Sequence, residues 1–215
     1  KTDIANFRSS NGTWYILRSK DGLTSLQFGA AGDIPVPADY DGDRKADVAV
    51  FRPSNGTWYI QRSMDGAIGV QFGQAGDQPV AADFDGDGKA DIGVFRPSNG
   101  VWYINQSAEG IKAIQFGIAT DRAVAADYDG DGKADVAVFR NNGTWYVMGS
   151  KIGFTGVQFG QAGDIPVAAD YDGDGKADMA VYRNGIWYLL QSKDGFKGVP
   201  FGMSTDTPVP ASFVR

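Results

Sequence analysis

Four short segments of this chain carry aspartates at a spacing that suits a divalent cation. In each segment, carboxylates occupy positions 1, 3, 5 and 9 of a nine-residue stretch, glycine lies between them, and a lysine stands at position 7. Closely spaced oxygen ligands on a turn, with the backbone carbonyl of position 7, suit a hard cation that takes six or more ligands at flexible geometry. We expect four calcium sites, with the lysines binding through their carbonyls: Asp39, Asp41, Asp43, Lys45 and Asp47; Asp83, Asp85, Asp87, Lys89 and Asp91; Asp127, Asp129, Asp131, Lys133 and Asp135; Asp170, Asp172, Asp174, Lys176 and Asp178.

Other metals and the helix-flanked calcium loop fit this pattern less well. Zinc prefers nitrogen or sulfur ligands, and the chain has no histidine and no cysteine. Magnesium demands stricter octahedral geometry and keeps its waters. The helix-flanked loop needs a glutamate at position 12, where this chain has Val50, Val94, Val138 and Val181.

Aspartate and glycine also form plain polar turns, which is the alternative to a metal site. Two carboxylates about 5 Å apart repel by roughly 3 kcal/mol at an effective dielectric near 20. Each loop gathers four carboxylates beside a single lysine, so charge favours a bound cation. Arg44 stands where the other loops have Gly88, Gly132 and Gly175, so we expect a weaker or distorted first site if that position needs a positive φ.

The acidic segments belong to an internal repeat that covers the chain. Its tryptophans recur at spacings of 44, 44, 43 and 42 residues, and Phe-Gly pairs keep the same spacings. Within a unit, residues alternate with period two, and Asn-Gly or Asp-Gly pairs supply the positive φ of tight hairpins. In the second unit this predicts strands at 79–84, 90–96, 101–107 and 111–116. The repeated tryptophans are Trp14, Trp58, Trp102, Trp145 and Trp187.

Repeated units of four antiparallel strands indicate an all-β chain folded as a β-propeller with five four-stranded blades. We expect one domain over residues 1–215, with repeat boundaries near 36, 80, 124 and 167. The last segment matches the innermost strand that the first unit lacks, so residues 208–213 should pair with residues 4–8 and close the ring, with a seam between 208–215 and 1–8. The alternative is a linear fragment of a larger propeller with seven or eight blades.

The D-x-D-G-D-G-K-A-D loop, followed by a short apolar strand and a Phe-Gly pair once per unit, resembles the FG-GAP and VCBS repeats. This resemblance implies a calcium-bound β-propeller, as in the integrin α-subunit head and in many secreted or surface-attached bacterial proteins, used for adhesion or as a module beside an enzyme. The fifth loop departs from the motif, because Ser212, Val214 and Arg215 replace the expected Asp, Asp and Gly. No fifth ion is therefore expected.

The acidic residues argue against an enzyme. Five-bladed propellers include glycosidases, which need two carboxylates in different environments. Sixteen of the 26 acids lie in the four loops, and the others recur at a few further repeat positions, so every acid has copies in equivalent surroundings. Without histidine or cysteine the usual nucleophile and base pairs are also absent. We expect no catalytic residues.

Two further repeated sets are read as structural. A ring of aspartates that includes Asp33 should pair with the arginines at the end of strand two and lock the blades, although such a ring could also hold a ligand. In each Trp-Tyr pair the tryptophan should face the core and the tyrosine the other face. The arginines are Arg8, Arg52, Arg96, Arg140 and Arg183.

Charge and chain features limit the partners. A net charge of −6 disfavours nucleic acid and anionic lipid, and no apolar stretch approaches the roughly 18 residues of a membrane span. The start of the chain has no secretory apolar region. Calcium loops of extracellular modules bind at about 0.1 to 1 mM, which predicts a secreted or cell-surface location.

These observations lead to a functional expectation. We expect a monomeric, non-catalytic, calcium-binding adhesion or recognition propeller whose partner is a protein or glycan on a cell surface or matrix. The alternatives are a multivalent carbohydrate-binding lectin, a non-catalytic module of a larger secreted enzyme or surface protein, and a scaffold with no ligand of its own.

Overall fold

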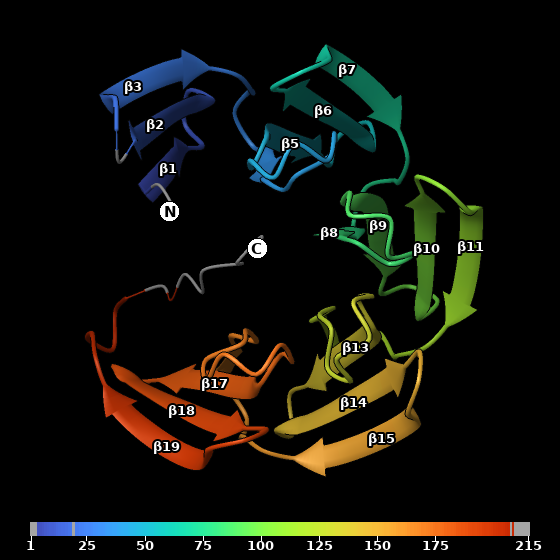
Figure 1. Cartoon of the computed structure of the whole chain (residues 1–215), viewed down its shortest axis with the longest axis vertical. Helices are drawn as coiled ribbons and strands as arrows, with labels where there is room; N and C mark the ends of the chain where they lie inside the picture. The colour runs from blue at the N-terminus through green and yellow to red at the C-terminus, as the bar shows by residue number, and fades with distance from the viewer. Residues whose placement is uncertain (1–3, 19, 207, 209–215) are drawn as a thin grey trace.

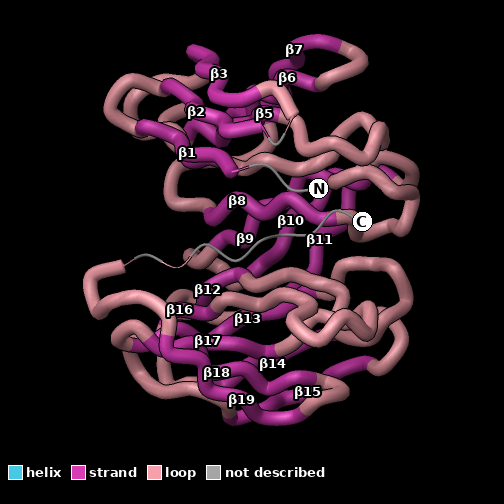
Figure 2. Tube along the Cα trace, turned by 60° about the vertical axis from the view of Figure 1, so that its left-hand side comes forward, coloured by secondary structure: helices cyan, strands magenta, loops and turns pink. Residues whose placement is uncertain are grey.

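The computed structural model describes residues 4–18, 20–206 and 208, and these residues form five antiparallel sheets arranged in a ring (Figure 1). The described residues contain nineteen strands and no helix, so Figure 2 shows only strands and loops. It follows that no described segment is a helix able to span a membrane. The predicted all-β, five-bladed propeller is confirmed.

Each blade is a meander in which consecutive strands pair, and strands are named here blade by blade. Blade 1 contains β1 (Ile4–Arg8), β2 (Thr13–Arg18) and β3 (Gly22–Gln27). Blade 2 contains β4 (Ile34–Pro35), β5 (Val48–Arg52), β6 (Thr57–Arg62) and β7 (Gly66–Gln71). Blade 3 contains β8 (Gln78–Ala82), β9 (Asp91–Arg96), β10 (Val101–Gln106) and β11 (Gly110–Gln115). Blade 4 contains β12 (Arg122–Ala123), β13 (Val136–Arg140), β14 (Thr144–Gly149) and β15 (Gly153–Gln158), and blade 5 contains β16 (Ile165–Pro166), β17 (Met179–Arg183), β18 (Ile186–Gln191) and β19 (Gly195–Pro200).

The strands predicted for the second unit match β8 to β11 to within two residues at each end. The innermost strand is short in blades 2, 4 and 5, where two residues pair as a strand and a single bridge follows further along. In blade 2 this bridge joins Ala38 to Asp47, the last position of the acidic loop. The inner strand and the acidic loop are therefore one continuous hairpin.

Four of the five repeated tryptophans are buried, as the alternation predicted, and Trp187 is partly buried. Trp58, Trp102 and Trp145 are fully buried, and Trp58 packs on Phe51 of the adjacent strand with ring centroids 5.5 Å apart. The Trp58 indole N–H donates to the carbonyl of Phe72 at 2.9 Å, so the buried donor is satisfied. The core around Trp58 also includes Val94 of blade 3, so neighbouring blades bury each other's faces.

The Asn-Gly and Phe-Gly pairs meet in space, which explains why glycine recurs at both. Gly56 has a φ of 65°, and a Cβ built on it would lie 2.1 Å from the carbonyl oxygen of Gly73. The amide of Phe72 donates to the carbonyl of Gly56 at 2.9 Å. A side chain at this position would break the backbone contact that joins the second hairpin to the end of the outer strand.

An aspartate and an arginine form the predicted structural pair at each of four blade junctions. Asp33, in the linker before β4, accepts two hydrogen bonds from Arg52, at 2.8 Å from Nε and from Nη2, and its side chain is 1% exposed. The guanidinium carbon of Arg52 lies 4.4 Å from the Tyr59 ring centroid. The same pairs recur as Asp77 with Arg96, Asp121 with Arg140, and Asp164 with Arg183.

The first and fifth blades are neighbours in the ring (Figure 1). At this seam Arg8 stacks on Tyr15 and donates to its hydroxyl at 2.8 Å, and Asp206 accepts the amide N–H of Met203 at 2.9 Å. The predicted closing strand, 208–213, lies almost entirely outside the described residues, as does Asp3. Ring closure by that strand stays a prediction.

Candidate metal centres

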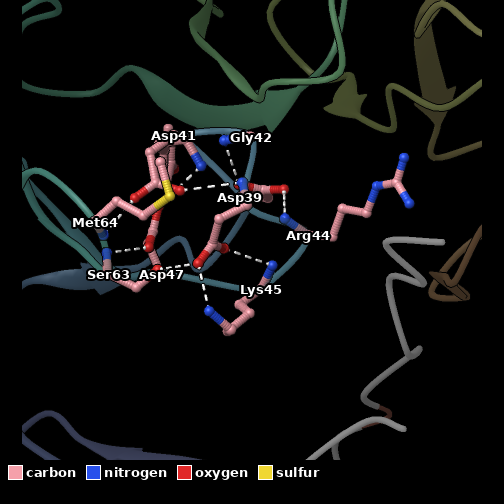
Figure 3. A network of polar contacts seen from close by, with 10 residues as sticks. Asp39, Asp41, Gly42, Arg44, Lys45, Asp47, Ser63 and Met64 are labelled. Atoms are coloured by element: carbon pink, nitrogen blue, oxygen red, sulfur yellow. Dashed lines mark hydrogen bonds and ion pairs between the residues drawn. The ribbon is translucent and has the colours of Figure 1, made fainter.

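The four acidic loops are placed alike, each between the innermost strand of its blade and the second strand. In the first loop the carboxylate of position 1 organises the turn (Figure 3). Asp39 accepts the amide N–H of Gly42 on Oδ1 and that of Arg44 on Oδ2, both at 2.7 Å. Corresponding bonds recur in the other loops, so the loop backbone wraps around its first carboxylate.

The carboxylate of position 9 is buried beneath the loop. Asp47 is 1% exposed and accepts the amide N–H of Tyr40 at 2.9 Å and that of Ser63 at 2.8 Å. Burial raises the pKa of Asp47, and the negative charges of Asp41 and Asp39 raise this pKa further, against the two hydrogen bonds that lower it. The pKa values of Asp91, Asp135 and Asp178 are raised for the same first reason.

The carboxylate of position 3 ties the loop to the outer hairpin of its own blade. Asp41 Oδ2 accepts the amide N–H of Met64 at 2.8 Å, and Oδ1 accepts that of Asp43 at 3.2 Å (Figure 3). Asp85, Asp129 and Asp172 make the corresponding bond to the β10–β11, β14–β15 and β18–β19 turns. The acidic loop and the outer hairpin of a blade are thus one hydrogen-bonded unit.

The carboxylate of position 5 binds a serine that the sequence reasoning missed. Asp43 Oδ2 accepts the hydroxyl of Ser63 at 2.7 Å, while Lys45 Nζ lies 2.6 Å from the same oxygen. The hydrogen bonds lower the pKa of Asp43, that to Lys45 most strongly. Recurrence with the repeat period was the signal that could have found these serines: Ser63, Ser107, Ser150 and Ser192.

Three carboxylates converge in each loop. Their oxygen atoms lie within 4.8 Å of one another, close enough to share one cation. In the first loop the converging residues are those of positions 1, 3 and 5, whereas in the other three they are those of positions 1, 3 and 9. The groups are Asp39, Asp41 and Asp43; Asp83, Asp85 and Asp91; Asp127, Asp129 and Asp135; Asp170, Asp172 and Asp178.

A buried carboxylate oxygen in the third loop favours a bound cation. Asp129 is 5% exposed, and its Oδ1 is buried without a hydrogen-bond partner in the described part of the chain. An ionised oxygen buried without a partner is costly, and Asp129 is also one of three converging carboxylates. An all-oxygen set of this kind fits a hard divalent cation such as calcium, which when bound would neutralise the repelling charges.

Neighbouring loops touch one another around the ring. The amide of Ala90, at position 8 of the second loop, donates to the carbonyl of Asp39 at 2.6 Å, and Ala134 and Ala177 repeat this bond to Asp83 and Asp127. The side chain of Lys89 packs over Gly42, where a Cβ would meet its Cγ and Cε at 3.3 Å. The lysines of position 7 thus help to join one loop to the preceding one.

Arg44 adopts the backbone conformation that glycine adopts in the other loops. Its φ is 65°, and the φ angles of Gly88, Gly132 and Gly175 are 86°, 87° and 92°. The position therefore needs a positive φ, which costs a residue with a side chain roughly 1 kcal/mol or more. The first loop carries this strain and also groups its carboxylates differently.

The five blades and the acidic loops within them define the class of this protein: it is a repeat β-propeller with candidate cation sites. A family model of the FG-GAP-like repeat matches residues 39–94 and 83–138. Each match begins at one acidic loop and ends in the strand that follows the next acidic loop. Residues 39–138 therefore carry FG-GAP-like repeats, as the resemblance in the sequence implied. No curated protein matches the sequence.

Solved structures share the fold at low sequence identity. A streptogramin B lyase aligns with a TM-score of 0.58 and 8% identity over 95% of this chain and 66% of its own. BBS1N, in complex with ARL6DN, aligns with a TM-score of 0.53 and 13% identity over 91% of this chain and 60% of its own. A lectin of Agrocybe aegerita that recognises non-reducing terminal N-acetylglucosamine aligns with a TM-score of 0.51 and 17% identity over 91% of this chain and 74% of its own. The chain thus spans about 60% of the length of BBS1N, and these likenesses concern the fold alone.

Proposed function

We propose that this chain is a non-catalytic recognition propeller that is stabilised by calcium and works outside the cytoplasm. The observation that carries the proposal is the convergence of three carboxylates in each of four equivalent loops, with the unpartnered Oδ1 of Asp129 among them. Calcium sites of extracellular modules bind at about 0.1 to 1 mM, far above cytosolic calcium. Each calcium would hold its loop against the outer hairpin of the same blade and so fix the surface around it.

The absence of catalysis is part of this proposal. Asp33, Asp77, Asp121 and Asp164 each bind an arginine, and the loop carboxylates bind backbone amides, so these aspartates have structural partners. A glycosidase needs two carboxylates in different environments, and four equivalent copies of each group do not supply them. The test is incubation of the calcium-loaded chain with chromogenic glycosides, where reproducible turnover lost in Asp77→Asn would overturn the proposal.

The partner is proposed to be a protein or a glycan presented on a cell surface or matrix. Calcium-loaded and EDTA-treated chain would be applied to immobilised matrix proteins and to a glycan array. We expect saturable binding to at least one surface in calcium and its loss in EDTA. Equal binding, or none, in both conditions would contradict calcium-dependent recognition.

A multivalent lectin is the second candidate, and the fold it shares with the Agrocybe aegerita lectin favours it. The glycan array tests this candidate, because a multivalent lectin should bind isolated glycans without any matrix protein, whereas binding to the matrix proteins alone would favour adhesion to a protein. A module of a larger secreted enzyme or surface protein remains the third reading. It predicts binding to neither panel and unchanged stabilisation by calcium.

A further inference from the structure

The junction between blades 5 and 1, the seam, differs from other junctions in its apolar packing. The core cluster of blade 2 includes Val94 of blade 3, that of blade 3 includes Val138 of blade 4, and that of blade 4 includes Val181 of blade 5. Among the described residues, the cluster of blade 5 contains no side chain of blade 1. Asn6 occupies the repeat position of these valines in blade 1 and is exposed, whereas each valine is 1% exposed. Apolar burial therefore stabilises the seam less than these three junctions.

Arg8, the last residue of β1, is oriented to bind a carboxylate but forms no ion pair within the described part of the chain. At the four other junctions the arginine of this repeat position binds an aspartate whose side chain is at most 1% exposed. Arg8 stacks on its tyrosine as those arginines do: its guanidinium carbon lies 4.5 Å from the Tyr15 ring centroid, against 4.4 to 4.8 Å in the other blades. The side chain is already ordered, so a carboxylate binds to it at little further cost in side-chain entropy.

Asp206 has the repeat position and the local turn of the four paired aspartates. Its carboxylate accepts the amide N–H of Met203 at 2.9 Å, and its own amide donates to the Met203 carbonyl at 3.0 Å. The corresponding bonds between Asp33 and Ala30 measure 2.8 and 3.2 Å. Tyr182, which stands where the other blades have phenylalanine, donates its hydroxyl to the same Met203 carbonyl at 2.6 Å. The turn is therefore formed and anchored on blade 5, yet Asp206 is exposed whereas Asp33 is buried.

The paired junctions show how these two groups fit together. In blade 2, the ion pair of Asp33 and Arg52 lies one residue beyond the first bridge between β4 and β5. An Asp206–Arg8 pair of the same geometry sets the register of the predicted closing strand against β1, and a slip of one residue would turn its side chains to the wrong face. A guanidinium that donates two parallel hydrogen bonds to a carboxylate forms a strong and directional contact. At a junction with little apolar packing, such a contact carries a larger share of the stability.

We propose that Asp206 and Arg8 form a latch that closes the ring, and that the ring opens at the seam first when this pair breaks. In the closed ring the guanidinium of Arg8 binds Asp206, and in the open ring it donates only to the Tyr15 hydroxyl. Both charges are exposed when they are apart, so salt screens their attraction and favours the open ring. The latch goes beyond the proposed surface recognition, because it requires neither a calcium ion nor a partner.

The chain has no cysteine, so two introduced cysteines carry the only spin labels in a distance measurement on the full chain. Ser10→Cys with Ser204→Cys places one label on each side of the seam. Ser98→Cys with Ala75→Cys places labels at the same repeat positions across the junction of blades 2 and 3 and serves as the matched control. All four residues are exposed. Pulsed electron paramagnetic resonance at low ionic strength and saturating calcium should give one narrow distance for each pair.

Breaking the latch should change only the seam distance. Arg8→Met and Asp206→Asn should each add a longer distance for the seam labels, with a roughly tenfold shift in the ratio of closed to open ring. The double variant should open no further than either single variant, because both changes remove one contact. Salt at about 1 M should open the parent in the same way. Asp21→Asn, which changes an exposed aspartate elsewhere in blade 1, should leave the distance unchanged.

The control labels separate an open ring from an unfolded one. In the Arg8→Met and Asp206→Asn backgrounds they should keep their single distance, because the junction of blades 2 and 3 retains its own ion pair and apolar cluster. Seam distances like those of the parent in both single variants would overturn the proposal, as would equal broadening at the control junction. Calcium is saturating and no surface partner is present, so failure of the latch leaves calcium-dependent recognition intact.

Discussion

Removing divalent cations should lower the stability of this protein by a large part of its total. Four loops each hold three converging carboxylates, and the position-9 aspartates of three of these groups are 1% exposed. At 1 mM free calcium and a dissociation constant near 0.1 mM, each site contributes about 1.4 kcal/mol, so four contribute roughly 5 to 6 kcal/mol. Domains of this length shift by about 2 to 4 °C per kcal/mol, which predicts a fall of roughly 10 to 20 °C in Tm.

Scanning calorimetry in EDTA, in magnesium and in calcium measures this effect. We expect calcium to restore the Tm fully and magnesium to restore it poorly, because magnesium demands stricter geometry. Titration calorimetry should count four ions per chain, the first loop being the weakest. Identical melting curves in EDTA and in calcium, or no bound ion, would show that the acidic loops are only turns.

A single-site variant places the effect on one loop. Asp129→Ala removes the carboxylate with the unpartnered oxygen and should lower the calcium count by one and the Tm in calcium by a few degrees. The control, Asp21→Ala, removes an exposed aspartate outside the loops and should change neither measurement. Equal effects of the two variants would refute the assignment of a cation to the third loop.

Three further substitutions test the framework by urea unfolding in EDTA. Arg44→Gly should stabilise the chain by about 1 kcal/mol, because glycine adopts a positive φ without the strain that a side chain causes. Unchanged stability would contradict the inference that Arg44 is strained. Asp77→Asn should destabilise by about 2 to 3 kcal/mol, because it removes the buried carboxylate that pairs with the partly buried Arg96. Glu109→Gln, in an exposed pair, should cost under about 1 kcal/mol. Gly56→Ala should destabilise by more than about 2 kcal/mol, since its Cβ would lie 2.1 Å from a backbone oxygen. Gly66→Ala, whose Cβ would face open space, should cost only about 1 kcal/mol for its positive φ. Equal costs of the two variants would contradict the close approach at Gly56.

The local structure of a blade could be predicted from the sequence because it depends on neighbours along the chain. Alternation of period two around Trp58 fixes which side chains face the core, and Asn-Gly pairs fix the tight turns. Four of the five tryptophans are buried as predicted, Trp187 is partly buried, and β8 to β11 follow the expected ranges closely. The positive φ expected at Arg44 could also be read from the glycines at the same repeat position.

Contacts between distant segments required the tertiary structure. The sequence placed four carboxylates in each loop. Only the fold shows that, in the second loop, the carboxylate of Asp87 accepts a hydrogen bond from the Ser107 hydroxyl. The carboxylates of Asp83, Asp85 and Asp91 converge instead. The serine comes from a hairpin about twenty residues away, and its effect depends on where that hairpin packs.

The sequence by itself therefore determined the repeat, the all-β class, the five blades and the residues from which any cation site must be built, because a periodic sequence imposes the same local geometry on every unit. Only the tertiary structure decided which oxygens converge and how one loop bonds to the next. These features depend on how segments that are distant in the sequence pack within a blade and between neighbouring blades.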